Sequence, residues 1–386
     1  MFSKDLINSF TSLKTPYYFY DLDLLQATIV TLKKEANKYG FIVHYAVKAN
    51  ANDKILKLIN ENGLGADCVS GNEISKSLEV GFSNNEIVFA GVGKTDEEIN
   101  LGLKKDIFCF NCESVQELEV INNLAKQMGK ISNVALRINP NVDAKTHYYI
   151  TTGLEENKFG INPWELDEVL TKLISLVNIK LTGLHFHIGS QITDLEVFKG
   201  LCIRVNEIHK WFNEHNIDFE HINVGGGYGV DYQDPDNDSI PDFKSFFKIF
   251  NDLLEFKQNQ KIHFELGRTI VAHCGSLISK VLYIKKGINT NFAILDAGMT
   301  ELMRPALYQS YHKIENLSSN GRQERYDVVG PICESSDTFG KSVLLPETNR
   351  GDIIAIRSTG AYGEVMSSGY NLRDRVKAVY SDEIYE

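Results

Sequence analysis

Short apolar runs alternate with longer amphipathic segments through residues 41–270. Eight of these runs are rich in β-branched and aromatic residues, as strands are: residues 41–48, 64–70, 86–92, 106–112, 133–139, 181–188, 221–225 and 261–266. The segments between them place apolar residues at i, i+3 and i+4, most clearly in residues 54–60, 73–80, 114–128, 163–176 and 243–256. Eight strand–helix alternations predict an α/β fold, a (β/α)8 barrel of the TIM type with parallel strands and crossover helices.

The rhythm changes after about residue 275, where β-like runs follow one another without helical segments between them. These runs cover residues 277–284, 292–296, 325–329 and 353–356. Residues 16–21 also look like a strand, and because chain ends often meet in space, we expect them to join this second sheet. We therefore predict a barrel over residues 25–275 and a mainly β domain made of residues 1–24 and 276–386. Residues 231–241, rich in Asp, Pro and Asn, are predicted to be a surface loop of the barrel.

Composition narrows the possible partners and the compartment. The 386 residues carry a net charge of −11, which argues against nucleic acid or an anionic membrane as the main partner. No apolar stretch approaches the length of a membrane span, and the first residues lack the zones of a signal peptide, so we expect a cytoplasmic protein. Six scattered cysteines suit reduced thiols; Cys109 and Cys112 share CxxC spacing, but no second pair supports a zinc or redox site.

Polar and glycine residues gather where the apolar runs end: Lys48, Asp67, Arg137, His187, Gly225 to Gly227, Glu265 and Arg268. In (β/α)8 barrels these strand ends form the active face. Lys48 is the only cationic side chain of its run. Partial desolvation would lower the pKa of such an amine and make it able to form a Schiff base, whereas the alternative is a solvated strand cap.

Three motifs at the strand ends each allow a functional and a structural interpretation. The run Gly225-Gly-Gly-Tyr-Gly229 can cradle a phosphate or make a tight turn, and no P-loop or dinucleotide fingerprint accompanies it. Glu265 and Arg268 can bind a ligand's ring nitrogen and an anionic group, or form a structural ion pair. His185 and His187 alternate and so face the same side, but no third ligand supports a metal site.

The second domain adds three further candidates. Cys333 stands beside Glu334 in a loop that follows Gly-Pro, where an exposed thiol can act as an acid or base; a buried inert cysteine is the alternative. The segments Arg304-Pro-Ala-Leu-Tyr308 and Gly360-Ala-Tyr362-Gly363 place an arginine and two tyrosines between glycines or beside a proline.

Taken together, these motifs resemble the diaminopimelate decarboxylases, which belong to the fold type III pyridoxal-phosphate enzymes. The motifs are, in order, YAVKAN (45–50), HFHIGSQ (185–191), GGGYG (225–229), ELGR (265–268), RPALY (304–308), CESSD (333–337) and GAYG (360–363). Residues 139–140, 146–147, 152–153 and 157–160 also look like segments of that family. Ornithine and arginine decarboxylases share the scaffold but less of this detail.

The resemblance implies pyridoxal 5′-phosphate as cofactor, decarboxylation of meso-2,6-diaminopimelate to L-lysine and CO2, and a place as the last step of bacterial lysine biosynthesis. It implies that Lys48 binds the cofactor as a Schiff base, that His187 stacks on the ring and that Glu265 keeps the ring nitrogen protonated. The remaining cofactor contacts that it implies are Asp67, Arg137, Ser190, Gly225, Gly226, Gly227, Gly267, Arg268 and Tyr362.

The same resemblance implies substrate contacts and a partner. Arg268, Arg304 and Tyr308 would bind carboxylates, Glu334 the distal amine, and Tyr362 would lie between cofactor and substrate. Cys333 would donate a proton from the partner subunit, so a homodimer with shared active sites is expected.

The alternatives are a related basic amino-acid decarboxylase, a non-catalytic homologue and a purely structural barrel. The chain departs from the family pattern at Leu266, where proline is usual, at Ser336, where glycine is usual, and within residues 371–375.

Overall fold

The computed structural model describes residues 2–142 and 158–384 and divides them into two compact units. We call Ile29–Gly229 with Asp242–Gly267 the barrel unit. The β-rich unit comprises the chain up to Thr28, Val230–Pro241 and the chain from Arg268 onward. Residues 231–241 form a mostly exposed or half-buried loop, as we expected, but Val230–Pro241 belongs with the β-rich unit, so our assignment of this loop to the barrel was wrong.

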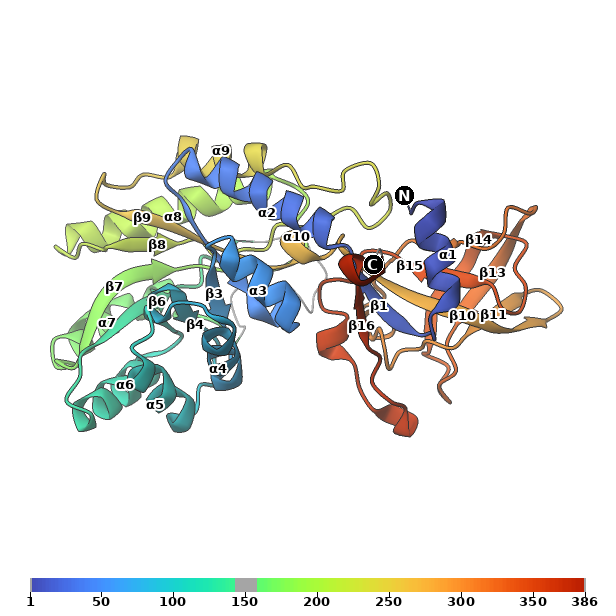
Figure 1. The fold of residues 1–386 in the computed structure, drawn as a ribbon. Coiled ribbons are helices and arrows are strands. Elements are labelled where there is room, and N and C mark those ends of the chain that lie inside the picture. Colours follow the sequence, from blue (N-terminus) through green and yellow to red (C-terminus); the bar gives the residue numbers. More distant parts are fainter. Residues whose placement is uncertain (1, 143–157, 385–386) are drawn as a thin grey trace. The chain divides into compact units, whose positions relative to one another are not determined.

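The barrel unit is built on eight parallel strands that close on themselves (Figure 1). The strands are β2 (Ile42–Ala46), β3 (Gly65–Cys68), β4 (Ile87–Phe89), β5 (Cys109–Cys112), β6 (Ser132–Arg137), β7 (Ile179–His185), β8 (His221–Asn223) and β9 (Lys261–Leu266). The barrel closes because β2 pairs with both β3 and β9, with His44 opposite Gly65 on one side and opposite Glu265 on the other. The predicted (β/α)8 architecture is confirmed.

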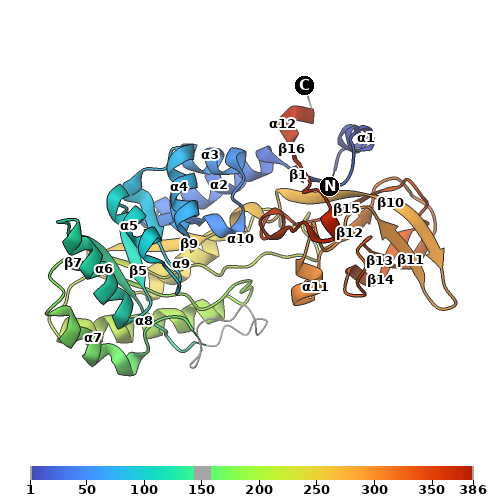
Figure 2. The same ribbon diagram turned by 90° about the horizontal axis from the view of Figure 1, so that it is seen from below.

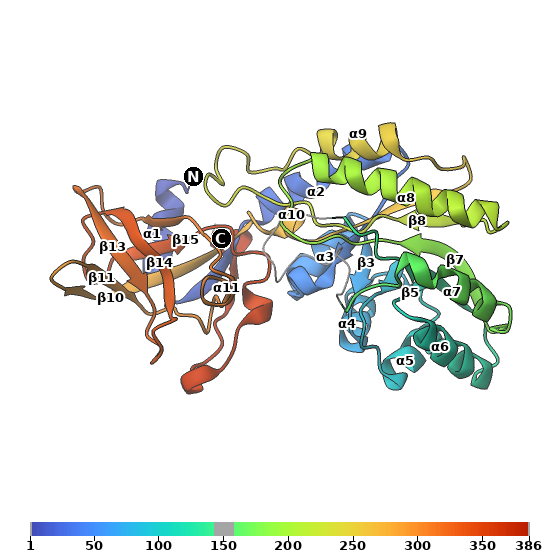
Figure 3. The same cartoon turned by 180° about the vertical axis from the view of Figure 1, so that it is seen from behind.

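Helices follow the strands on the outside of the barrel, and two of them, α8 and α9, pack against each other (Figure 3). Their bounds are α3 (Asp53–Glu61), α4 (Gly71–Val80), α5 (Asp96–Lys105), α6 (Val115–Gln127), α7 (Leu166–Leu173), α8 (Glu196–Glu214) and α9 (Phe243–Leu253). Helix α2 (Leu22–Asn37) precedes β2 and is divided between the two units after Thr28. Several begin at a capping side chain: the Ser70 and Ser114 hydroxyls accept backbone N–H groups of α4 and α6. Because these caps stand close behind β3 and β5, they end each strand-to-helix loop after only a few residues.

The opposite end of the barrel, where the strands begin, holds a cluster of buried rings. Nδ1 of His44 contacts the Glu86 carbonyl at 3.0 Å, and its Nε2 contacts Nδ1 of His263 at 2.9 Å. The ring of Phe108 stacks on His263, and His221 packs beside both. These rings border a cavity of about 420 Å³.

The β-rich unit contains an eight-stranded sheet in which β12, β15, β10, β11, β13 and β14 are neighbours in that order. The strands are β1 (Tyr17–Tyr20), β10 (Gly275–Lys286), β11 (Asn291–Leu295), β12 (Ile314–Asn316), β13 (Gln323–Val329), β14 (Thr338–Pro346), β15 (Ile353–Ile356) and β16 (Ala378–Tyr380). Strand β1 pairs antiparallel with β10 and parallel with β16 (Figure 2), so the predicted joining of the N-terminal strand to this sheet is confirmed.

The short helices of this unit are α1 (Lys4–Ser12), α10 (Arg268–Val271), α11 (Arg304–Tyr308) and α12 (Ser381–Ile384). Phe10 of α1 packs on Tyr17, Ile278 and Ile353 in one apolar core, which explains why α1 lies on the sheet. No helix in the described ranges is long and apolar enough to cross a bilayer.

Candidate functional site

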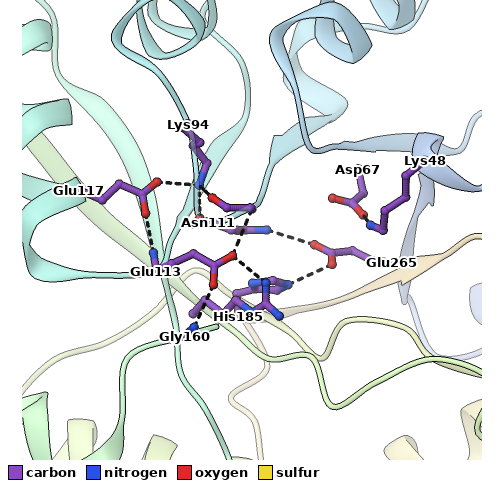
Figure 4. Close-up of polar contacts among 11 residues, drawn as sticks. Lys48, Asp67, Lys94, Asn111, Glu113, Glu117, Gly160, His185 and Glu265 are labelled. Carbon is purple, nitrogen blue, oxygen red and sulfur yellow. Dashed lines mark hydrogen bonds and ion pairs between the residues drawn. The ribbon is translucent and has the colours of Figure 1, made fainter. Parts of the chain in front are cut away.

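Lys48 lies at the carboxyl end of the barrel strands, in the short turn Val47–Ala49 that follows β2. Its Nζ lies 2.6 Å from Oδ2 of Asp67, which sits in β3 and is fully buried (Figure 4). Burial, together with the negative charge of Glu265, raises the pKa of Asp67 to about 7, although Lys48 opposes this shift. We expected apolar surroundings for this amine, but the structure places it against a buried carboxylate whose proton affinity is unusually high.

Glu265 stands in β9 with both carboxylate oxygens accepting hydrogen bonds. Asn111 and Asn223 donate their Nδ2–H groups to Oε1, at 3.1 Å and 2.8 Å. Nε2 of His185 lies 3.0 Å from Oε2 (Figure 4). Burial alone would raise the pKa of Glu265, but His185 and Lys48 outweigh it and hold the pKa well below its ordinary value. Glu265 is thus a buried carboxylate that is ionised at neutral pH.

The glycine run after β8 has no room for side chains. A Cβ at Gly225 would lie 2.2 Å from the Phe186 carbonyl oxygen, and one at Gly226 would lie 1.8 Å from that of Glu265. Gly225 and Gly227 also have positive φ values of 72° and 98°. The half-buried Ser190 lies in the neighbouring loop after β7. Such a backbone lets N–H groups approach an anion closely.

His187 and Arg137 follow at the ends of β7 and β6. Burial, with help from the positive charges of Arg137 and Lys48, lowers the pKa of His187 to about 3, so the imidazole stays neutral. Arg137 is buried, and its NH1 donates to Oε1 of Glu113 at 2.7 Å. A neutral ring beside a fixed cation is suited to packing against a planar ligand.

A buried ionic network that we did not predict supports this end of the barrel (Figure 4). Glu113 accepts the backbone N–H groups of Gly91 and Gly160 in addition to Arg137. Its own N–H donates to Glu117, which pairs with Lys94 at 2.6 Å. The network ties together loops from several strands and so fixes the position of Arg137.

The partners of Glu265 and Arg137 could not be predicted from the local sequence pattern. Asn111 lies inside the CxxC run that we weighed as a metal site, and Asn223 directly precedes the glycine run. His185 was considered as a metal ligand, but it contacts Glu265 instead. Among the described residues, no group of three His, Cys, Asp or Glu side chains could hold a metal ion.

The other candidates divide between the units. Gly267 follows β9, where a Cβ would lie 2.9 Å from that of Ala49. In the β-rich unit, NH1 of Arg268 and NH1 of Arg304 each donate to the Tyr232 hydroxyl oxygen at 2.7 Å. The Arg268 guanidinium also lies 4.7 Å from the ring centre of Tyr362. Both arginines are buried, so this unit holds a compact cationic cluster.

The last predicted side chains lie near the surface of the β-rich unit. Cys333 is exposed, whereas Cys68, Cys109, Cys112, Cys202 and Cys274 are buried. Glu334 accepts a hydrogen bond from the Tyr370 hydroxyl at 2.7 Å, and Tyr308 is half-buried at the end of α11. The family-like residues 146–147 and 152–153, and the first residue of 157–160, lie outside the described residues.

The barrel-unit residues fit pyridoxal phosphate. The glycine run offers close backbone approach to a phosphate, and Lys48 offers an amine beside a carboxylate that can take its proton. Glu265 offers an ionised carboxylate for a protonated ring nitrogen.

Comparisons with known proteins agree with this chemistry. Residues 24–272 match the family model "Pyridoxal-dependent decarboxylase, pyridoxal binding domain". The chain is 58% identical over 379 residues to diaminopimelate decarboxylase of Bacteroides thetaiotaomicron, covering 98% of both chains. The crystal structure of diaminopimelate decarboxylase from Helicobacter pylori complexed with L-lysine matches with a TM-score of 0.91 and 41% identity, over 97% of this chain and 93% of that one.

A lysine/ornithine decarboxylase complexed with putrescine from Vibrio vulnificus has a TM-score of 0.84 at 20% identity, over 99% of this chain and 100% of that one, and this likeness concerns the fold alone. The matches at higher identity extend over nearly the whole of both chains. The chain therefore belongs to the pyridoxal-dependent decarboxylases and, within them, to the diaminopimelate decarboxylase family.

Proposed function

We propose that this chain is a carboxy-lyase that converts meso-2,6-diaminopimelate to L-lysine and CO2 with pyridoxal 5′-phosphate, the last step of bacterial lysine biosynthesis. The observation that carries the proposal is the 58% identity to a diaminopimelate decarboxylase over 98% of both chains. A cytoplasmic location is part of the proposal, and it fits the finding that none of the six cysteines is in a disulfide.

The barrel unit holds the cofactor. Lys48 binds it covalently through Nζ, Ser190 and the glycine run bind its phosphate, and Glu265 pairs with its ring nitrogen. When bound, pyridoxal phosphate withdraws the electron pair that remains after CO2 leaves. The neutral His187 packs against the ring, with Arg137 and Gly267 nearby; a charged imidazole would instead repel the protonated ring nitrogen.

Asp67 acts as the proton acceptor for Lys48. Its pKa, raised to about 7, makes it a better acceptor for a proton of the amine, which lies 2.6 Å away, than an ordinary aspartate would be. Lys48 can thus lose a proton to a carboxylate that already contacts it.

The β-rich unit recognises the substrate. Arg268, Arg304 and Tyr308 bind carboxylates, Glu334 binds the distal amine, and Tyr362 lines the position between cofactor and substrate. Guanidinium groups suit this task because they donate two parallel hydrogen bonds to a carboxylate. A distal carboxylate is the group that distinguishes diaminopimelate from ornithine or lysine as substrates.

Cys333 donates a proton to the carbon that has lost CO2, and it acts on the site of a partner subunit in a homodimer. Its exposure supports this arrangement, since a thiol that serves a partner must lie on the surface. Mixing inactive Lys48→Ala and Cys333→Ala proteins would test it. Random exchange of subunits should restore about a quarter of the wild-type activity, because half of the dimers then carry one intact site. No recovery despite proven exchange would contradict shared sites.

The function itself is tested by measuring CO2 release and lysine formation from meso-diaminopimelate with added pyridoxal phosphate. Ornithine, arginine and lysine serve as competing substrates, and Lys48→Ala serves as the catalytic control. Turnover of diaminopimelate alone, lost in the variant, is the expected result. Turnover of another amino acid instead would keep the chemistry but refute the substrate, and failure of the wild type with all four would refute the function.

A further inference from the structure

Residues 225–241 contain two tyrosines, Tyr228 and Tyr232, and Tyr232 belongs to the segment Val230–Pro241 of the β-rich unit. The segment is held by ion pairs: Arg357 lies 2.8 Å from Asp236, and Lys313 lies 3.6 Å from the same carboxylate. These ion pairs keep Tyr232 in place, with 8% of its surface exposed.

One oxygen atom of Tyr232 joins two arginines. NH1 of Arg268 and NH1 of Arg304 both donate to the hydroxyl oxygen at 2.7 Å, although the two residues are 36 positions apart in the sequence. The Arg304 guanidinium lies 5.1 Å from the centre of the Tyr232 ring, and His312 meets that ring edge-on at 4.9 Å. The phenol therefore fixes both guanidinium groups by hydrogen bonds and one of them by its ring as well.

Two buried guanidinium groups repel each other unless an electron-rich group lies between them. The Tyr232 oxygen is such a group, and the two arginines lower its pKa although burial by itself would raise it. Without this oxygen the two cations would separate, and a carboxylate would no longer meet both.

We propose that Tyr232 is a positioning residue for substrate recognition: its hydroxyl oxygen holds the Arg268 and Arg304 guanidinium groups together so that they bind the substrate carboxylate that is not lost. This inference rests on the proposed function, in which those arginines bind carboxylates. Because the product L-lysine keeps that carboxylate, the role of Tyr232 extends to product binding.

The test compares two ligands of the holoenzyme by equilibrium dialysis, which needs no turnover. L-Lysine carries the retained carboxylate, whereas 1,5-diaminopentane has the same amines and no carboxylate. In Tyr232→Phe we expect the Kd of L-lysine to rise about 10- to 100-fold, the range for losing a charge-assisted hydrogen bond. The Kd of 1,5-diaminopentane should change by less than about threefold, because this amine has no carboxylate for the paired arginines to bind.

Two further variants serve as a matched control and as an independent test. Tyr283→Phe removes a hydroxyl from an exposed tyrosine of β10 and should leave both ligands unaffected. Asp236→Asn weakens the anchor of the segment without touching Tyr232, and should raise the Kd of L-lysine in the same direction but less, which keeps the inference testable if Tyr232→Phe does not fold.

Unchanged L-lysine binding in Tyr232→Phe would overturn the inference, and equal weakening of both ligands would show a merely structural role. A wild-type protein that binds no L-lysine would also overturn it. The two proposals can fail separately. If L-lysine binds the wild type and binds Tyr232→Phe more weakly, but the wild type releases no CO2 from diaminopimelate, the proposed function is refuted and the role of Tyr232 stands.

Discussion

Replacing Glu265 with glutamine removes one buried negative charge while almost keeping the shape of the side chain. The carboxylate accepts three hydrogen bonds, from Asn111, Asn223 and His185. An amide has a single acceptor oxygen, so it can keep the two asparagine donors only if its NH2 group faces Nε2 of His185. That imidazole must then carry its proton on Nδ1, which is buried and has no hydrogen-bond partner among the described residues.

The cost can be estimated for folding and for catalysis separately. A buried unsatisfied N–H destabilises a protein by about 1–3 kcal/mol, and relief from burying a charge offsets part of this, so the variant should still fold. A carboxylate attracts a protonated ring nitrogen at hydrogen-bond distance by about 6 kcal/mol at an effective dielectric constant near 20. A neutral amide recovers roughly half, and the remaining loss of about 3 kcal/mol corresponds to a fall in kcat of about 100-fold.

The assay is CO2 release from diaminopimelate at saturating substrate and cofactor, with bound cofactor quantified by its visible absorbance. The control is Glu61→Gln, the same change at an exposed position at the end of α3. A Glu265→Gln variant that binds the cofactor fully and keeps kcat within about threefold of the wild type would refute the assignment of Glu265 to the ring nitrogen.

Three further changes test other parts of the molecule. Gly226→Ala should raise the Kd of pyridoxal phosphate at least about 100-fold, because the added Cβ would lie 1.8 Å from a backbone oxygen. The control is Gly200→Ala, whose Cβ meets no atom within 4 Å and which should bind the cofactor normally in the same titration. Arg304→Ala should lower kcat/KM for diaminopimelate by about 100-fold or more while cofactor affinity stays the same, and an unchanged kcat/KM would count against the substrate assignment. Burial lowers the pKa of His221 from 6.5 to about 3, so below pH 6.5 this imidazole takes up a proton in the unfolded chain but not in the folded one. The folded protein should therefore lose about 2 kcal/mol of stability from His221 between pH 7 and pH 5. Urea unfolding between pH 7 and pH 5 gives the slope of the free energy of unfolding against pH, which should show that His221→Phe takes up about one proton fewer on unfolding than the wild type. The same slope in both proteins would contradict a buried, neutral His221.

The barrel could be predicted because its strands are buried on both faces. A parallel strand inside a barrel reads as a nearly continuous apolar run, and the lengths between runs left room for a helix each time. The run 261–266 coincides with β9, while the others differ by a few residues at their ends. Since residues at the ends of parallel strands meet at one rim, the positions of Lys48, Asp67 and Glu265 followed from the same pattern.

The strands that were missed belong to the open sheet of the β-rich unit. β12 and β14 end the row of paired strands, and β14 exposes much of its length to solvent. β16 has three residues, all half-buried. Edge strands need fewer apolar residues than central ones, so composition alone does not separate them from loops.

Side-chain partners were the hardest feature to predict, because they join strands that are far apart in the sequence. Asn111 and Glu265 are separated by 154 positions, and neither residue's neighbours indicate the other. The segment Val230–Pro241 shows the same difficulty, because long-range partners bury a residue that the local sequence predicts to be exposed. Its Asp, Pro and Asn content predicts exposure, yet Tyr232 is buried because its oxygen accepts hydrogen bonds from two buried guanidinium groups. The average hydropathy of such a polar segment therefore does not predict the burial of its tyrosine. The better guide is whether the tyrosine hydroxyl could accept hydrogen bonds from buried cationic side chains.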